Sequence, residues 1–201
     1  MKSLYKNEQS GRSMVEMLGV LAIIGVLSIG GISGYSKAMA KYRVNKTLDQ
    51  ISMLVMNIRS LFSASYTYEG LTEAVAIQMG IIPGDMQDKN DTGKIINAYQ
   101  GGVFLATGSS GGADRSFIVQ YAGLTQEACV AIATADWGSQ AGSGLVSIKV
   151  GPGKNGDKRT KVDAFTSTFE VDDMPVAISA AANACSATND DTGNVVQWEY
   201  Y

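Results

Sequence analysis

The hydrophobic and polar positions divide the chain into a polar start, a long apolar segment and a mixed remainder. Residues 1–13 are polar and carry three cationic side chains, whereas residues 14–35 are apolar apart from Glu16 and a few small or polar uncharged residues. A helix over residues 14–35 would be about 33 Å long at roughly 1.5 Å per residue, enough to cross a hydrocarbon core of about 30 Å. The pattern therefore predicts a membrane-spanning helix close to the N-terminus.

Beyond Tyr35 the apolar positions become one-sided, which predicts that the same helix continues to about residue 63. Apolar residues recur there at spacings of three and four, and polar residues occupy the rest of the helical wheel. The apolar positions are Val44, Leu48, Ile51, Val55, Ile58 and Phe62. One face of residues 36–63 can therefore bury against a globular head formed by residues 64–201.

The remainder of the chain predicts an antiparallel sheet with short helices. Strands are expected at residues 103–107, 116–121, 145–150 and 195–201, with a glycine-rich hairpin loop between the first two. Helices are expected at residues 71–79, from the cap residue Thr125 to about Ala135, and from a first-turn Pro175 to about Cys185. The predicted fold class is α+β, a long N-terminal helix packed on a head with an antiparallel β-sheet and short helices.

Composition argues against catalysis and against nucleic-acid binding. The chain has no histidine, which removes the commonest general base and the commonest metal ligand. The formal net charge is −3, and the cationic residues are scattered, so no nucleic-acid partner is predicted. No cofactor and no metal are predicted either.

Two short motifs resemble ligand-binding loops but lack the required context. The GPGKNG stretch at residues 151–156 matches a dinucleotide-binding glycine pattern, yet the following DKRTKVD has no helical periodicity. The DKNDTG stretch begins like a calcium loop at Asp88, but Thr92 and Tyr99 stand where ligands are needed. No catalytic residue is predicted, although a Ser–Lys pair stays open.

The charges around the apolar segment predict its orientation and the state of the two cysteines. Lys2, Lys6 and Arg12 form a cationic flank before the segment, which predicts a cytoplasmic N-terminus and a head outside. No small-residue cleavage site closes a short apolar core, so the segment is expected to be retained. In an oxidising compartment Cys129 and Cys185 would form one disulfide, whereas in the cytosol they would be two buried thiols.

Glu16 is the anomaly of the apolar segment. A charge in a membrane helix costs on the order of 2 to 3 kcal/mol, which makes this carboxylate a candidate for function. The alternative is that its side chain simply reaches the lipid headgroups. Position alone does not separate the two interpretations.

Gly11 and the following RSMVEMLGVLAIIGVLSIGGISGYS resemble the class III signal of type IV pilins and pseudopilins. In that family a prepilin peptidase cuts after the glycine and methylates the new N-terminus, and a glutamate stands at the fifth mature position. Counted from Arg12 as the first mature residue, Glu16 is the fifth. Arg12 departs from the Phe, Met or Leu that the family usually has there. The resemblance implies a leader of residues 1–11.

The resemblance further implies a structural subunit of a type IV pilus, a homopolymer joined through N-terminal helices. Residues 12–35 would span the inner membrane before assembly and line the fibre core afterwards, when the pilus is extracellular. Glu16 would neutralise the N-terminal amine of Arg12, in the same chain or a neighbour. The partners implied are prepilin peptidase and the pilus assembly machinery. The disulfide-closed region 129–185 would form much of the exposed fibre surface, for adhesion, motility, aggregation or mating contact.

Two other functions remain open. One is a pseudopilin of a type II secretion system, which has the same kind of N-terminus. The heads of pseudopilins often bind calcium, and many lack a disulfide near the C-terminus. The cysteine pair and the imperfect calcium loop favour the pilus. A membrane-anchored enzyme or binding domain would have no need of a glutamate at the fifth position. Major and minor subunits, and the IVa and IVb branches, are not separated by the sequence.

Replacement of the glycine at the expected cleavage site tests the leader directly. Gly11→Val should block processing, because a branched side chain would obstruct the peptidase site. Intact-mass measurement of the membrane fraction should then show the full-length chain rather than one beginning at Arg12. A fully processed variant would reject this cleavage site.

Overall fold

The computed structural model describes residues 14–138, 143–154, 156–188 and 192–201. They form two compact units, residues 14–41 and residues 42–201. Helix α1 (Met14–Leu61) supplies all of the described part of the first unit and the beginning of the second. The continuous helix expected up to about residue 63 is confirmed.

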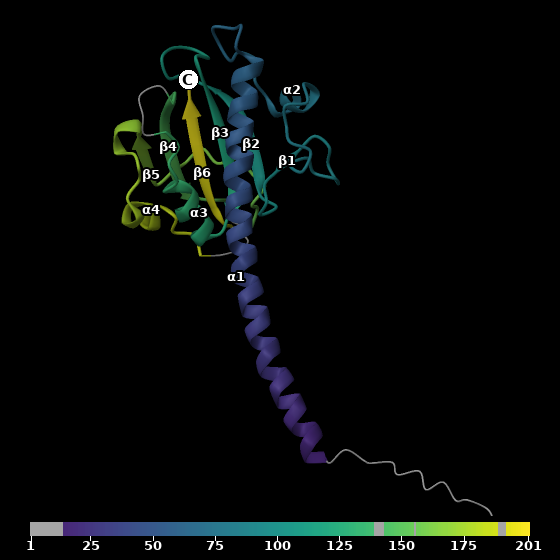
Figure 1. Ribbon diagram of the computed structural model, residues 1–201. Coiled ribbons are helices and arrows are strands. Elements are labelled where there is room, and N and C mark those ends of the chain that lie inside the picture. Colours follow the sequence, from purple (N-terminus) through teal and green to yellow (C-terminus); the bar gives the residue numbers. More distant parts are fainter. Residues whose placement is uncertain (1–13, 139–142, 155, 189–191) are drawn as a thin grey trace, which may run out of the picture. The chain divides into compact units, whose positions relative to one another are not determined.

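An antiparallel sheet forms the centre of the second unit (Figure 1). Within the described residues its strands are β1 (Ile95–Ile96), β2 (Gly102–Gly108), β3 (Ser116–Leu124), β4 (Leu145–Pro152), β5 (Ser167–Glu170) and β6 (Asn194–Tyr200). Their order in the sheet is β1-β2-β3-β6-β4-β5, and all neighbours are antiparallel. The last strand of the chain therefore lies in the middle, between β3 and β4.

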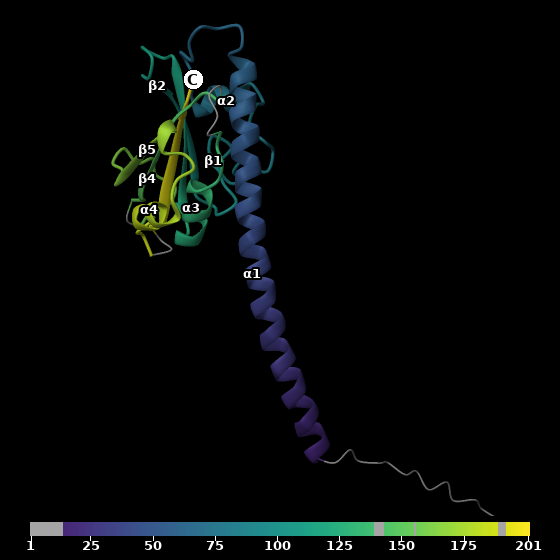
Figure 2. The ribbon, with the colours of Figure 1, turned by 60° about the vertical axis from the view of Figure 1, so that its left-hand side comes forward.

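One face of this sheet packs against the C-terminal half of α1, as Figures 1 and 2 show. Ile51, Leu54 and Ile58 of the helix are fully buried, and they belong to one core with alternate residues of the central strands. These strand residues are Phe117, Val119, Tyr121, Val196, Trp198 and Tyr200. Each buried side chain of this size contributes about 1.5 to 3 kcal/mol of transfer free energy. The one-sided apolar pattern of residues 36–63 thus marks the buried face of the helix.

The short helices follow their capping residues. Thr72 and Thr125 cap α2 (Glu73–Gln78) and α3 (Gln126–Ala133), and each hydroxyl accepts a hydrogen bond from a first-turn amide. A 3₁₀ turn, η1 (Val171–Asp173), and helix α4 (Ile178–Ala184) follow β5.

The expectation for Pro175 is wrong. Helix α4 begins at Ile178 with Ala177 as its N-cap, so Pro175 lies in the preceding turn, after a cis peptide bond. Met174 before it is extended, with φ −85° and ψ 143°, as a residue preceding proline prefers. The sequence pattern also does not predict the edge strands β1 and β5. Both are short, and their apolar residues form no long alternating run.

Close approach of two backbones at one end of β6 requires glycine. Gly193 has φ +62°, and a Cβ built there would lie 2.7 Å from the Cα of Gly123. Gly123 itself has φ +69° and sits at the irregularity in the pairing of β3 with β6. Real Cβ contacts essentially never reach this distance, so a side chain would have to push β3 and β6 apart.

Gly193→Ala should therefore destabilise the head more than an alanine at a glycine that is equally left-handed but uncrowded. Gly80, with φ +68° and no atom within 4 Å of a built Cβ, is the matched control. Gly80→Ala should cost about 1 kcal/mol for the backbone conformation, and Gly193→Ala at least about 2 kcal/mol. Urea unfolding of the detergent-solubilised chain, followed by tryptophan fluorescence, measures both. Equal losses would mean that the backbones separate without cost.

Candidate functional site

The first unit presents an apolar surface that its own residues leave uncovered. Helix α1 contains a strongly apolar stretch of 18 residues, none of which is buried in the structure. By length and composition this is the one helix of the described residues that could cross a membrane. Large side chains such as Val15, Leu18 and Ile29 are more than half exposed. Apolar surface of this extent marks a site of contact with lipid or protein.

Glu16 lies in the first turn of α1, inside this apolar surface. It is the only charged residue from Met14 to Ser36 in the sequence. The helix dipole favours a carboxylate at this end by about 0.3 to 1 kcal/mol, less than the 2 to 3 kcal/mol that an apolar environment costs. The remaining difference has to be offset by a partner or by water.

Two serine hydroxyls in the same segment are already satisfied. The Ser28 hydroxyl donates to the Ile24 carbonyl at 2.7 Å, and the Ser36 hydroxyl donates to the Ile32 carbonyl at 3.0 Å. Such bonds within the helix remove the cost of placing a hydroxyl in an apolar environment. Glu16 is thus set apart from the other polar residues of the segment by its charge. Gly11 and Arg12, the expected processing residues, lie outside the described residues.

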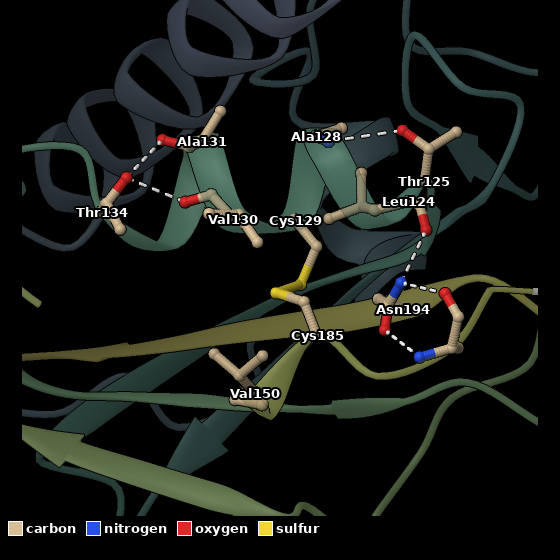
Figure 3. Close-up of a disulfide and its surroundings, with 12 residues drawn as sticks. Leu124, Thr125, Ala128, Cys129, Val130, Ala131, Thr134, Val150, Cys185 and Asn194 are labelled. Carbon is tan, nitrogen blue, oxygen red and sulfur yellow. Dashed lines mark hydrogen bonds between the residues drawn. A yellow bond between two sulfur atoms is a disulfide. The ribbon is translucent and has the colours of Figure 1, made fainter. Parts of the chain in front are cut away.

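The second unit is braced by the disulfide between Cys129 and Cys185 (Figure 3). The two Cα atoms are 5.9 Å apart, and both residues are fully buried. Cys129 lies on α3, and Cys185 directly follows α4, so the bond joins the two helices as the sequence predicts. In the chain-entropy model, closing a loop of this length stabilises the head by about 4 kcal/mol.

Asn194 reinforces the same region. Its amide nitrogen donates to the carbonyls of Leu124 and Ala187, and its side-chain oxygen accepts from the Ala187 amide (Figure 3). This buried side chain therefore ties the beginning of β6 both to the end of β3 and to the segment after α4. Nothing in the local sequence distinguishes it from an ordinary turn asparagine.

The calcium-like loop is occupied by protein groups. One Asp88 carboxylate oxygen pairs with the Arg159 guanidinium at 2.7 Å, and the other accepts from the Asn90 amide at 2.9 Å. Within the described residues, no group of three or more acidic or cysteine side chains is placed to hold a metal ion. The glycine motif at residues 151–156 begins in β4, and the next regular element is β5 rather than a helix.

A cavity of about 270 Å³ opens beside β1 and the beginning of β2. Its apolar wall includes Ile96 and Phe104, and three charged residues line it. Each of these already has a partner: Glu73 accepts from the Leu105 amide, Lys94 pairs with Asp91, and Arg159 pairs with Asp88. Among the described lining residues, no charged group is therefore left unpaired for a ligand.

The sheet face opposite α1 carries a buried polar layer that a loop covers. The Gln120 side chain donates to the Val162 carbonyl at 2.7 Å and to Gln197 at 3.0 Å, and it accepts from the Val162 amide at 2.9 Å. The loop between β4 and β5 is thereby held across β3. In the sequence, polar residues alternate with apolar ones along these strands. Such alternation predicts that the polar face is exposed to solvent, so it does not predict a polar face that is covered by a loop.

Glu199 belongs to this layer and is only 7% exposed. Its carboxylate accepts from the Ser116 hydroxyl at 2.6 Å and from the Ser110 amide at 3.3 Å. Burial opposes ionisation of Glu199, but the hydrogen bonds from Ser110 and Ser116 outweigh burial and hold the pKa below its ordinary value. A carboxylate kept ionised in this way is a structural acceptor rather than a proton donor.

Comparison with known proteins places the head in a family. Residues 41–198 match the family model described as PilS N terminal. No curated protein sequence matches the chain.

Two solved structures share the fold. The type IV b pilin from Salmonella typhi is 21% identical, with a TM-score of 0.54 over 78% of this chain and 98% of that chain. TcpA, a type IV pilin from the El Tor biotype of Vibrio cholerae, is 12% identical, with a TM-score of 0.50 over 80% of this chain and 99% of that chain. At these identities the similarity is one of fold.

The lowered pKa of Glu199 predicts a specific loss of stability in acid. The folded carboxyl has the lower pKa, so the unfolded chain binds more protons, and stability falls as the pH drops below about 5 through the folded pKa. Glu199→Gln keeps the shape but cannot titrate. Its unfolding free energy should be lower than wild type at pH 7, and the difference should shrink towards pH 3. A difference independent of pH would show that the charge of Glu199 does not stabilise the fold.

Proposed function

Because this chain belongs to the PilS family and has the type IV pilin fold, we propose that it is a structural subunit of a type IV pilus. The observation that carries the proposal is the apolar, exposed stretch of α1 over residues 14–36, in which Glu16 of the first turn is the single charge. In a soluble monomer this apolar surface would be exposed to water, which is unfavourable. The subunit acts by assembly, and it is not an enzyme.

The same apolar surface would serve two environments in turn. Before assembly residues 12–35 would span the inner membrane, with the N-terminus in the cytoplasm, because Lys2, Lys6 and Arg12 form a cationic flank at its N-terminal side. In the filament the surface would be covered by the helices of other copies, which are as apolar as lipid. Transfer between the two therefore requires little change in hydrophobic free energy, and packing and polar contacts decide the arrangement.

Glu16 would supply the polar contact. After cleavage behind Gly11 by a prepilin peptidase, the amine of Arg12 becomes a charge at the start of the apolar helix. Pairing of that amine with Glu16, of the same chain or a neighbour, removes two isolated charges from an apolar bundle. Leaving one of them unpaired would cost about 3 to 5 kcal/mol, which is enough to select one register between subunits.

Intact-mass analysis of the native membrane fraction and of sheared extracellular material tests the proposal. A mass beginning at Arg12, with or without a methyl group, should appear in both fractions and identify the processed pilin. Recovery in long sheared filaments would support a pilus rather than a short, envelope-bound pseudopilus. An unprocessed chain confined to the membrane would overturn the proposal and favour a simple anchored domain.

Glu16→Ala should leave folding and membrane insertion intact and lower the yield of filaments at least about tenfold, since an unpaired charge in an apolar environment costs several kcal/mol. Ser28→Ala is the matched control, because it removes a polar group of the same helix whose hydrogen bond is internal. Sheared filaments are measured by immunoblot against membrane-inserted protein. Wild-type yield from Glu16→Ala would refute the pairing role.

A further inference from the structure

The charges of the second unit are segregated along the sequence. Residues 154–163 hold four cations, Lys154, Lys158, Arg159 and Lys161, against Asp157 and Asp163, whereas residues 164–201 contain no Lys or Arg. We refer to the four cations as the basic patch. Glu170, Asp172 and Asp173, all exposed, form the acidic edge at β5 and η1.

The basic patch is held in place by the loop that crosses the polar face of the sheet. The Lys158 carbonyl accepts from the Gly102 amide of β2 at 3.0 Å. Both the carbonyl and the amide of Val162 are hydrogen-bonded to the Gln120 side chain of β3. Arg159 is anchored by its ion pair with Asp88. The backbone carrying Lys158 and Lys161 is therefore preorganised, and Lys161 is exposed to solvent.

The two charged surfaces are too far apart to neutralise each other within one molecule. The basic patch is fastened at β2 and β3, whereas the acidic edge lies at β5, three strands beyond β3 in the order β3-β6-β4-β5. At about 4.8 Å per strand this is a separation of about 14 Å, longer than the Debye length of about 8 Å at physiological ionic strength. Arg159 is already paired with Asp88, so within the described residues Lys154, Lys158 and Lys161 are the cations of the basic patch that can attract an acidic surface of another copy.

The acidic edge is also an open edge of the sheet. Strand β5 pairs with β4 alone among the described strands, and it is only four residues long. The negative charges at this edge discourage non-specific pairing with strands of other chains, and they favour a partner with positive charge. Asp173 accepts from the Glu170 amide within the turn, so Asp172 is the carboxylate whose replacement disturbs the turn least.

Two different surfaces of opposite charge on one subunit define a heterologous contact. Each copy can offer its acidic edge to one neighbour and its basic patch to another, and such contacts continue into open-ended assemblies when the rotation does not close a ring. A filament needs a contact of this kind. A symmetric contact between two identical patches would instead bring like charges together and stop at a dimer.

We propose that in the filament the acidic edge of one head docks on the basic patch of another copy of this chain. The inference rests on the proposed function, since it concerns the contacts between heads of polymerised subunits. The apolar helices hold the subunits together but do not fix how the heads are oriented. The charged contact determines which part of one head faces the next.

Charge reversal on the full-length chain tests the contact. Asp172→Lys and Lys161→Glu should each lower filament yield about fivefold or more at 0.15 M salt, because like charges then face each other. The two changes combined should restore the yield to within about twofold of wild type, since the charges are exchanged on both surfaces. Glu69→Lys and Arg115→Glu, which reverse exposed charges elsewhere on the head, are the matched controls.

A cysteine pair gives an independent test. The two native cysteines are joined to each other, so Asp172→Cys and Lys161→Cys placed in one chain are the only free thiols. A short thiol crosslinker applied to intact filaments should produce a ladder of dimers, trimers and longer oligomers, and either single substitution should not.

Two results would overturn the contact while leaving the proposed function in place. In the first, the double cysteine variant forms filaments in wild-type amounts, but the crosslinker produces no ladder from them. In the second, the single charge reversals assemble as well as their controls. If the wild-type chain is processed but never forms filaments, the proposed function itself fails. The wild-type sample, run beside every variant, separates these cases.

Discussion

Pairing of β6 with both β3 and β4 is the interaction on which the head depends. This strand is the last element of the chain, yet it fills the centre of the sheet and buries Trp198, whose ring makes edge contacts with the rings of Tyr121 and Trp137. Without β6 the hairpin of β2 and β3 would have no strand pairing with β4 and β5. The disulfide, Asn194 and the close backbone contact at Gly193 all act where β6 begins, so they secure the same strand.

The two faces of that strand have different chemistry. The face towards α1 is apolar and gains its stability from burial, which is large and has no direction. The opposite face carries Gln197 and Glu199, whose hydrogen bonds to Gln120, Ser116 and Ser110 hold neighbouring strands and loops at defined positions. Ser110 and Ser116 satisfy the Glu199 carboxylate, and the Gln120 side chain is satisfied by Gln197 and by the loop between β4 and β5. The head is consequently a rigid support for the charged groups that this loop exposes.

In the proposed filament, the two units would have different roles: the apolar helix would hold copies together, and the charged head would orient them. Residues 14–36 of the first unit form a large apolar surface with one charge, Glu16, suited to lipid or to other helices, whereas the second unit carries localised charges on its sheet. Apolar contacts are strong but tolerate rotation, and exposed ion pairs are weak but depend on geometry and salt. Together they can specify one arrangement among many copies, which neither could do alone.

The sequence by itself determined the elements that depend on local pattern. The long helix follows from its apolar period, α3 from the cap at Thr125, and four strands from their β-branched and aromatic residues. The likeness of the first forty residues to a pilin signal also singles out Glu16. Tertiary structure alone decided the central place of β6, the edge strands β1 and β5, the start of α4 after Pro175, and the burial of Glu199. These features arise from contacts between residues far apart in the chain, and local propensity contains no information about which strand pairs with which.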